Sequence, residues 1–360
     1  MKIIHAADIH LGHKRFGRIS SDGINERERD VFKVFTEFLE KAEALNPHLV
    51  LIAGDLFDSP RPSNYTLVSV FKALKASKLK FLIVPGNHDA PKKTEATSPI
   101  EILGILNNVF VVTRTSVFKM EDLAIFHLAD DKLDSLTQQY YDNLDSRWKI
   151  LIYHGLVKEL HPKAEVSVNE LNERFKFDYI ALGDFHQYCK LASNCFYSGS
   201  FDFVSPNFWA EAGGNKGFIE VDLKNAEVSF HRLLGQRRVV VLPEIDCSTL
   251  TEEELEEILY SALSNTELFG AIVRLILRNF SPRHNKALAS RRIRGREKEI
   301  FHLSVHYEFG EVCFSTKEFF LEGGLLKEFE AFLGSLSLES KLKSDLYLRF
   351  KNFINEVKEN

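Results

Sequence analysis

Short hydrophobic runs recur through the first two hundred positions of the chain, and a turn rich in aspartate, asparagine, histidine or glycine follows each of them. Apolar runs of this length between turn signals are typical of buried β-strands. We therefore expect a series of strands that carry polar turns at their carboxyl ends. The runs occupy residues 2–7, 49–53, 81–84, 150–153 and 179–182.

Helical periodicity fills the first two intervals between these runs, where hydrophobic residues recur at spacings of three and four. Strands that alternate with helices predict an α/β layered fold. Two later runs, 217–223 and 227–234, flank Lys224 and Asn225 and predict a strand pair that closes the first domain near residue 236. The periodic positions are Val31, Val34, Phe35, Phe38, Leu39 and Ala42, then Leu67, Val70, Phe71 and Leu74.

The pattern changes after residue 236, where a helix over 251–265, strands over 271–278 and 301–309 and a basic stretch between the strands predict a small α+β domain. Further on, residues 325–332 and 338–357 predict two amphipathic helices. The expected units are therefore a first domain, a capping domain and a C-terminal helical element, at 1–236, 237–314 and 315–360.

Composition adds few constraints. A chain of 360 residues with 44% hydrophobic residues and 30 Phe exceeds one typical core and has ample material for more than one. The four Cys show no CxxC spacing, which argues against a zinc knuckle or a disulfide framework. No apolar run is long enough to span a membrane, and the first residues lead directly into a strand pattern, so we expect a cytoplasmic protein with no membrane partner.

The polar turns carry the candidate chemistry. Carboxylate, imidazole and amide side chains are ligands that hard divalent cations accept, and two such cations generate a nucleophile and neutralise phosphoryl oxygens in phosphodiester hydrolysis. Asp8 and His10 are two residues apart, which would place them on one face of an extended segment. A single Asp or His at a strand end is more often a cap or a turn residue, but five such clusters in succession favour a metal site. The clusters are Asp8-Ile9-His10, Gly54-Asp55, Gly86-Asn87-His88-Asp89, His154-Gly155 and Gly183-Asp184-Phe185-His186.

Through DIH, GDLFD, GNHD, YHG and GDFH the sequence resembles the calcineurin-like metallophosphoesterases. Within that superfamily it is similar to the SbcD nucleases, bacterial relatives of the eukaryotic meiotic-recombination nuclease, in AADIHLGH, LVLIAGDLFDSPRPS and IVPGNHD. The resemblance is strongest over residues 1–235. It implies a four-layer α/β sandwich, a capping domain, and a DNA repair nuclease that acts in DNA break processing.

The resemblance also implies residue roles. Asp55 would bridge two metal ions, His88 would stand at the scissile phosphate as a catalytic residue, and Asp89 would orient the His88 ring. The remaining ligands would be Asp8, His10 and His186 at the first metal and Asn87, His154 and Asp184 at the second.

Asp184 departs from the family pattern, which has His there. A carboxylate still binds a hard metal, so manganese is expected and iron becomes a competitor; alternatively, Asp184 marks a degenerate second site. Asp58 stands where some relatives carry His, and it also has an ordinary explanation as a turn residue before Ser59 and Pro60.

Residues 283–298 hold seven basic residues against one acid, Glu297, in a chain of net charge −5. Such density can bind a DNA backbone without sequence readout, although charge runs are also common in solvated loops. The basic residues are Arg283, Lys286, Arg291, Arg292, Arg294, Arg296 and Lys298.

Leucine and phenylalanine residues form a stripe in the C-terminal helical stretch and pack either on the protein's own core or on a partner. The resemblance implies an SbcC-like, SMC-type ATPase as that partner, and a homodimer. The competing functions are a phosphodiesterase for nucleotides or other small phosphoesters, and a metal-poor scaffold. The stripe is formed by Leu338, Leu342, Leu346, Leu348, Phe350, Phe353 and Ile354.

Overall fold

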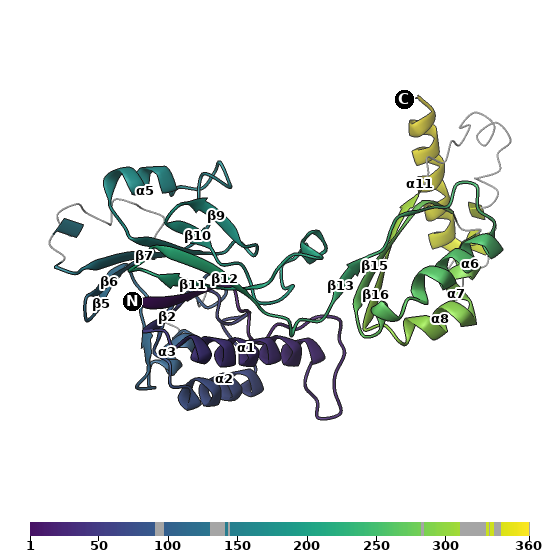
Figure 1. The fold of residues 1–360 in the computed structure, drawn as a ribbon. Helices are drawn as coiled ribbons and strands as arrows, with labels where there is room; N and C mark the ends of the chain where they lie inside the picture. The colour runs from purple at the N-terminus through teal and green to yellow at the C-terminus, as the bar shows by residue number, and fades with distance from the viewer. Residues whose placement is uncertain are drawn as a thin grey trace.

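The computed structural model describes residues 1–90, 97–129, 141–142, 145–281, 284–309, 329–330, 332–334 and 340–359. Figure 1 shows a large first domain and a smaller second domain, which the chain enters at β13 (Val239–Val241). None of the helices in these ranges is long and apolar enough to cross a membrane.

The first domain contains two six-stranded sheets. In the first sheet, β1, β2, β3 and β4 are parallel, and the antiparallel pair β11 and β12 extends it beyond β1. The predicted strands at residues 2–7, 49–53 and 81–84, and the predicted strand pair, are therefore confirmed. The bounds are β1 Lys2–Ala6, β2 Leu49–Ala53, β3 Phe81–Val84, β4 Val109–Val111, β11 Gly217–Asp222 and β12 Glu227–Arg232.

The second sheet has the order β5-β6-β7-β8-β10-β9. Its central strands β7 and β8 include the two remaining predicted runs, and β5, β6, β9 and β10 were not anticipated from the hydrophobic pattern. The bounds are β5 Ser116–Met120, β6 Leu123–Leu128, β7 Trp148–His154, β8 Tyr179–Gly183, β9 Cys189–Ala192 and β10 Cys195–Tyr197.

Helices cover the outer faces of the two sheets, so the first domain has the four layers that were expected. Figure 1 shows α1 (Glu26–Leu45), α2 (Asn64–Ala76) and α3 (Pro99–Leu103) on the first sheet and α5 (Val168–Arg174) on the second. Helix α1 begins where the Asn25 side chain accepts the Arg27 N–H, and its predicted apolar stripe is buried. One hydrophobic core lies between the sheets and one lies beneath each helical layer.

The second domain is a four-stranded sheet in which β13, β14 and β16 all pair with β15 in parallel. The predicted helix and strands are present, but the basic stretch is helical rather than a loop. Ser290 caps α8 by accepting the Ile293 N–H, and Ile293 is buried. The bounds are β14 Ile245–Asp246, α6 Glu252–Leu263, β15 Ile272–Phe280, α7 Asn285–Ala289, α8 Arg291–Glu297 and β16 His302–Phe309, with short 3-10 turns at Phe208–Glu211 and Thr266–Leu268.

Specific contacts join the two domains. Arg237 donates to both carboxylate oxygens of Asp30, at 2.7 and 2.9 Å, and its guanidinium lies 3.8 Å from the centre of the Phe301 ring. The Phe16 ring stacks on His302 with centroids 3.9 Å apart. Beyond the second domain, α11 (Ser340–Glu359) forms the C-terminal helix, whereas most of the predicted helix over 325–332 lies outside the described residues.

Candidate metal centre

The polar turns of both sheets meet at the carboxyl ends of β1, β2, β3, β7 and β8. Glycines allow this close approach: a Cβ on Gly54 would lie 2.1 Å from His154 Nδ1, and one on Gly86 would lie 2.1 Å from Asp55 Oδ1. A Cβ on Gly183 would lie 1.9 Å from the Ala53 carbonyl oxygen. Each glycine is therefore required because a functional side chain or a neighbouring strand occupies the space of its missing side chain.

Asp8 and His10 reach the same site by a different backbone route from the one expected. Strand β1 ends at Ala6, and Asp8 and His10 have φ angles of 51° and 53°, in the left-handed region. The alternation of an extended strand therefore does not apply to them, and that part of the prediction is wrong. Hydrogen bonds from Asp8 N to Gly54 O at 3.1 Å and from His10 N to Asp55 O at 3.0 Å hold this conformation.

Asp8, His10 and His186 form one potential ligand cluster, with one ligand atom from each residue within 4.8 Å of the others. The Nε2 atoms of His10 and His186 are 3.3 Å apart. Two imidazole nitrogens that face each other at this distance need a proton or a cation between them. Burial lowers the pKa of His186 to about 3, so its ring is an acceptor, whereas the Asp58 and Asp55 carboxylates outweigh burial and raise the pKa of His10. Either a proton on His10 or a bound cation can therefore join the two nitrogens.

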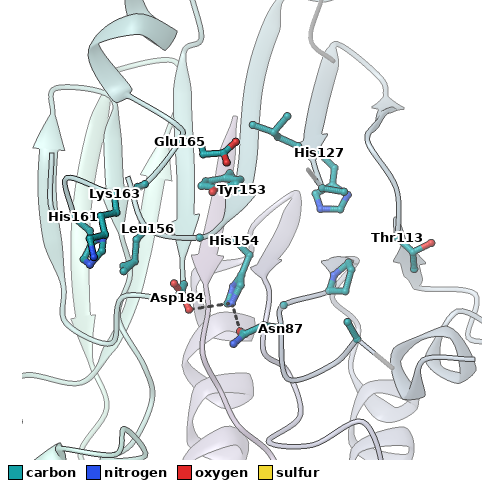
Figure 2. Close-up of a pocket in the computed structure, with 17 residues that line it drawn as sticks. Asn87, Thr113, His127, Tyr153, His154, Leu156, His161, Lys163, Glu165 and Asp184 are labelled. Carbon is teal, nitrogen blue, oxygen red and sulfur yellow. Dashed lines mark hydrogen bonds and ion pairs between the residues drawn. The ribbon is translucent and has the colours of Figure 1, made fainter. Parts of the chain in front are cut away.

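His154 organises a second cluster with Asp55, Asn87 and Asp184. Its Nδ1 donates to the Ala53 carbonyl oxygen at 2.8 Å, so Nε2 is the ring nitrogen that faces the cluster. That Nε2 lies 3.1 Å from Asn87 Oδ1, 3.4 Å from Asp55 Oδ2 and 3.8 Å from Asp184 Oδ1. Figure 2 shows the Asn87 and Asp184 side chains converging on this ring.

Negative charge exceeds positive charge in the buried part of the site. Burial raises the pKa of Asp8 to about 6, against the opposing influence of His154 and His10. Burial opposes protonation of His154, but the Asp55 and Asp8 carboxylates outweigh it and raise its pKa to about 10. Asp184 has a raised pKa, chiefly because of burial. Buried carboxylates need a compensating cation, so the donor set fits divalent metal ions.

His88 lies beside this centre, and the expected role of Asp89 is wrong. The His88 Nδ1 donates to the Asp58 carbonyl oxygen at 2.8 Å, and its ring lies edge-on to His10. The Asp89 carboxylate instead accepts the backbone N–H groups of Leu56, Phe57 and Gly86 at 3.1, 2.8 and 3.1 Å. Asp89 therefore fixes the loops that carry Asp55 and His88 rather than orienting the His88 ring.

Three residues that were not among the predicted ligands or catalytic residues contact the ligands of the site. Asp58 Oδ1 lies 3.1 Å from His10 Nδ1 and 3.0 Å from His13 Nδ1. Although burial opposes ionisation of Asp58, these two histidines hold its pKa well below the usual range. The buried Lys216 ammonium donates to the His186 carbonyl oxygen at 2.8 Å. Asp58 had been noted because some relatives carry His there, but a turn role was an equally available explanation. His13 gave no signal beyond its position near predicted ligands, and Lys216 gave none.

A cavity of about 680 Å³ opens beside the second cluster. Asn87, His154 and Asp184 line it, whereas His10 and His186 do not. Figure 2 shows Lys163, His161 and Glu165 along the wall formed by the segment after β7. A substrate can therefore reach the centre from the side of His154.

The basic stretch is separate from this centre. Arg283 lies outside the described residues, and Lys286 is in α7. Figure 1 shows α7 and α8 on the face of the β15 and β16 sheet that is turned away from the first domain. Arg292 pairs with Glu257, and Arg296 donates to Glu299 at 3.0 Å, so part of the local positive charge is neutralised within the domain. Arg291 and Arg294 are exposed on α8, and Lys298 follows it.

Comparisons with known proteins agree with this geometry. Residues 1–188 match the family model of the calcineurin-like phosphoesterases. Proteins named "DNA double-strand break repair protein Mre11" are similar: the one from Methanococcus maripaludis is 29% identical over 62% of this chain and 63% of its own length. The one from Sulfolobus acidocaldarius is 28% identical over 52% of this chain and 50% of its own.

The chain thus spans about half to two thirds of the length of these curated relatives. The crystal structure of TT1561 of Thermus thermophilus aligns with a TM-score of 0.44 and 11% identity, over 65% of this chain and 99% of that one. Because the family model covers more than half of the chain and includes all of the converging ligands, the chain belongs to the calcineurin-like phosphoesterases.

Proposed function

We propose that this protein is a two-metal-dependent DNA nuclease that hydrolyses phosphodiester bonds in DNA break processing. The observation that carries the proposal is the position of Asp55. Its Oδ2 lies 3.7 Å from His10 Nε2 and 3.4 Å from His154 Nε2, between the two ligand clusters. A carboxylate oxygen in that position suits a bridge between two cations, which in such sites lie roughly 3.5–4 Å apart.

The two clusters would hold one ion each. Asp8, His10 and His186 would hold the first, Asn87, His154 and Asp184 the second, with Asp55 shared. When bound, two hard cations supply a water-derived nucleophile at neutral pH and compensate the charge of the phosphoryl oxygens. The protein orients its ligands: the Ala53 carbonyl fixes His154, and the Asp184 backbone N–H donates to both Asp8 oxygens at 3.0 and 3.1 Å.

His88 would act on the substrate rather than on the metals. Its Nδ1 donates to the Asp58 carbonyl oxygen, so in the protonated ring Nε2 carries the proton that can pass to the leaving oxygen or hydrogen-bond to the phosphate. His88 also places a ligand atom within 4.8 Å of His10 and Asp55, which supports a position at the reacting phosphate.

Asp184 would make the second site harder than its family counterpart. Replacement of a neutral imidazole by a carboxylate lowers the charge of the centre by one unit and favours harder or more highly charged ions. We therefore infer that the protein accepts iron as well as manganese. The contact of the Asp184 side chain with His154 at 3.8 Å supports a working rather than a degenerate site.

DNA and an ATPase are the proposed partners. The names of the similar proteins, which refer to DNA double-strand break repair, support DNA. An SbcC-like, SMC-type ATPase would dock on α11, where Leu342, Leu348 and Phe353 are exposed at 47%, 59% and 59%. The exposed Arg291 and Arg294 would add backbone contacts to DNA, and a homodimer would present two such sites.

Metal analysis combined with cleavage assays tests the proposal. The purified protein should hold two divalent ions and should cleave linear, hairpin or single-stranded DNA as well as bis(p-nitrophenyl) phosphate. Hydrolysis of the small ester or of nucleotides without any cleavage of DNA would favour the small-phosphoester alternative. A protein that holds no metal and hydrolyses neither substrate would be a scaffold, and the proposal would fail.

A further inference from the structure

Asp58 lies shortly after Asp55 in the segment that follows β2. Backbone hydrogen bonds join this segment to the loop that carries Asp8 and His10. The Asp58 N–H donates to the Leu11 carbonyl oxygen at 3.1 Å, and the Leu11 N–H donates to the Leu56 carbonyl oxygen at 2.8 Å. Leu11 and Phe57 form a parallel bridge between the two loops. The Asp58 side chain is therefore presented to the first loop from one fixed position.

One carboxylate oxygen of Asp58 serves two histidines. Oδ1 lies 3.1 Å from His10 Nδ1 and 3.0 Å from His13 Nδ1. An ionised carboxylate only accepts hydrogen bonds, so both Nδ1 atoms carry hydrogen and donate. The lone pair of His10 is thereby placed on Nε2, which faces His186 Nε2 at 3.3 Å.

A turn role does not account for this side chain. An aspartate in a turn ordinarily accepts the backbone N–H two residues later, but the residue two positions after Asp58 is Pro60, which has no N–H to donate. In this turn Ser59 performs that function, because its Oγ accepts the Arg61 N–H at 3.2 Å. The Asp58 carboxylate is directed at His10 and His13 instead.

His13 supports the same oxygen from the other side. Its side chain is 9% exposed, and its Nε2 has no hydrogen-bond partner among the described residues. Within the described part of the chain, Asp58 is therefore the only polar partner of the His13 ring. A buried donor placed in this way holds the carboxylate in one orientation.

We propose that Asp58 is a positioning residue that sets the ring orientation and tautomer of His10, with His13 bracing the shared carboxylate oxygen. This inference deepens the proposed function and rests on it. Carboxylates that hold a ligating histidine typically contribute about 10- to 100-fold to metal affinity. The hydrogen bond between Asp58 and the His88 ring uses the Asp58 backbone oxygen, at 2.8 Å, so a substitution of the Asp58 side chain leaves it in place.

Manganese binding by the full chain is the first test. Titration of Mn²⁺, followed by the electron paramagnetic resonance of the free ion, should show two bound ions in the wild type. Asp58→Ala should weaken one of them by about 10- to 100-fold and leave the other unchanged. His13→Phe should cause a smaller loss at the same ion, and Ser59→Ala, which changes only the turn, should bind both ions normally.

Turnover provides a second readout. With bis(p-nitrophenyl) phosphate, Asp58→Ala should lose activity at limiting Mn²⁺ and recover the wild-type kcat at saturating Mn²⁺, because His10 is still present and mass action refills its site. Loss of kcat that saturating Mn²⁺ does not restore would overturn the positioning role, since a group needed for the chemistry cannot be replaced by more metal.

The tautomer of His10 can be observed without metal. Ring nitrogen NMR of the metal-free protein at a pH high enough to keep the His10 ring neutral, with its signal assigned through His10→Gln, should show hydrogen on Nδ1 in the wild type and a mixed tautomer in Asp58→Ala. If Asp58→Ala does not unfold cooperatively, Asp58→Leu, which is of similar size but has no hydrogen-bond acceptor, carries the same tests.

Two failures can be distinguished. A wild type that binds no Mn²⁺ and cleaves no phosphodiester would overturn the proposed function. A wild type that binds and cleaves normally, together with an Asp58→Ala variant of equal Mn²⁺ affinity and unchanged His10 tautomer, would overturn the role of Asp58 alone.

Discussion

The backbone N–H of His88 donates to Asp55 Oδ1 at 2.8 Å, while the other carboxylate oxygen of Asp55 faces His10 and His154. The two oxygens of this residue therefore have separate tasks. One fixes the loop that presents His88, and the other is available to bridge two cations. Substitutions at Asp55 and at His88 should consequently fail in different ways.

Asp55→Asn retains an oxygen that can accept the His88 N–H but loses the charge between the two clusters. Substitution of a residue that only supports a metal ligand typically reduces activity by up to about 100-fold. Because Asp55 is proposed to contact both metals directly, we expect cleavage by Asp55→Asn to fall by more than that. Elemental analysis should find fewer than two ions per chain, with a circular dichroism spectrum like that of the wild type. Full activity in Asp55→Asn or Asp55→Ala would refute the two-metal assignment.

His88→Ala should retain both metals and lose turnover. General acid catalysis typically contributes about 10²- to 10⁴-fold, and it matters most when the leaving oxygen is basic. The loss should therefore be large for DNA and much smaller for bis(p-nitrophenyl) phosphate, whose leaving group needs no proton. Equal losses on both substrates would favour a hydrogen bond to the phosphate over proton donation, and loss of the metals would show that His88 acts on the metals instead.

Most of the proposed ligands could be recognised from the sequence because each follows a hydrophobic run and the runs form adjacent strands. Parallel strands bring their carboxyl ends to one edge of a sheet, which places Asp55 and Asn87 together. His154 ends a strand of the second sheet, and its approach to them depends on how the two sheets pack. The left-handed backbone of Asp8 and His10 could not be anticipated, since it depends on hydrogen bonds from another loop rather than on local residue preference.

Other features depend on contacts between distant segments. Asp58 and His13 are separated by 45 positions, and local patterns do not report such a pair. Helix α8 could not be predicted from the sequence because arginines dominate its composition and its one buried apolar residue, Ile293, gives no periodic pattern. Strands β5 and β9 lie at the edges of the second sheet and alternate only weakly.

Asp184→His should shift metal loading toward manganese. Restoring an imidazole raises the charge of the centre by one unit and softens the second site. Wild type and variant should be grown in one defined metal mixture and analysed for iron and manganese, with anaerobic cleavage assays to keep iron reduced. Identical ratios would show that residue 184 does not determine metal choice, and a second ion present only in Asp184→His would identify the native site as degenerate.

Charge reversal on α8 tests the DNA contact. Arg291→Glu with Arg294→Glu should weaken DNA binding and reduce the slope of log K against log salt, by about 0.9 for each phosphate contact that is lost. Hydrolysis of bis(p-nitrophenyl) phosphate should not change. The matched control is Lys119→Glu with Lys224→Glu, on exposed positions of the first domain. Equal slopes for the two double variants and the wild type would make α8 an ordinary solvated helix.

His5 is expected to make stability pH-dependent without taking part in the metal centre. Its Nε2 donates to the Leu182 carbonyl oxygen at 3.1 Å, and its Nδ1 accepts the Tyr179 hydroxyl at 2.9 Å, so the buried ring is neutral. Burial lowers the pKa of His5 to about 3 from an ordinary value of 6.5. Between these two pH values, His5 therefore binds a proton in the unfolded chain but not in the folded chain.

The resulting contribution to stability is fully present above pH 6.5 and is lost as the pH falls from there toward 3. Between pH 7 and pH 5 it should decrease by about 2 kcal/mol. His5→Gln keeps a polar side chain but cannot titrate. The free energy of unfolding of wild type and variant should be measured by urea denaturation at each pH. Because both proteins have the same carboxylates, the difference between the two values reports the titration of His5 alone. A difference that stays constant from pH 7 to pH 5 would mean that His5 takes up its proton in the folded protein, and that the Tyr179 and Leu182 contacts do not hold the ring neutral.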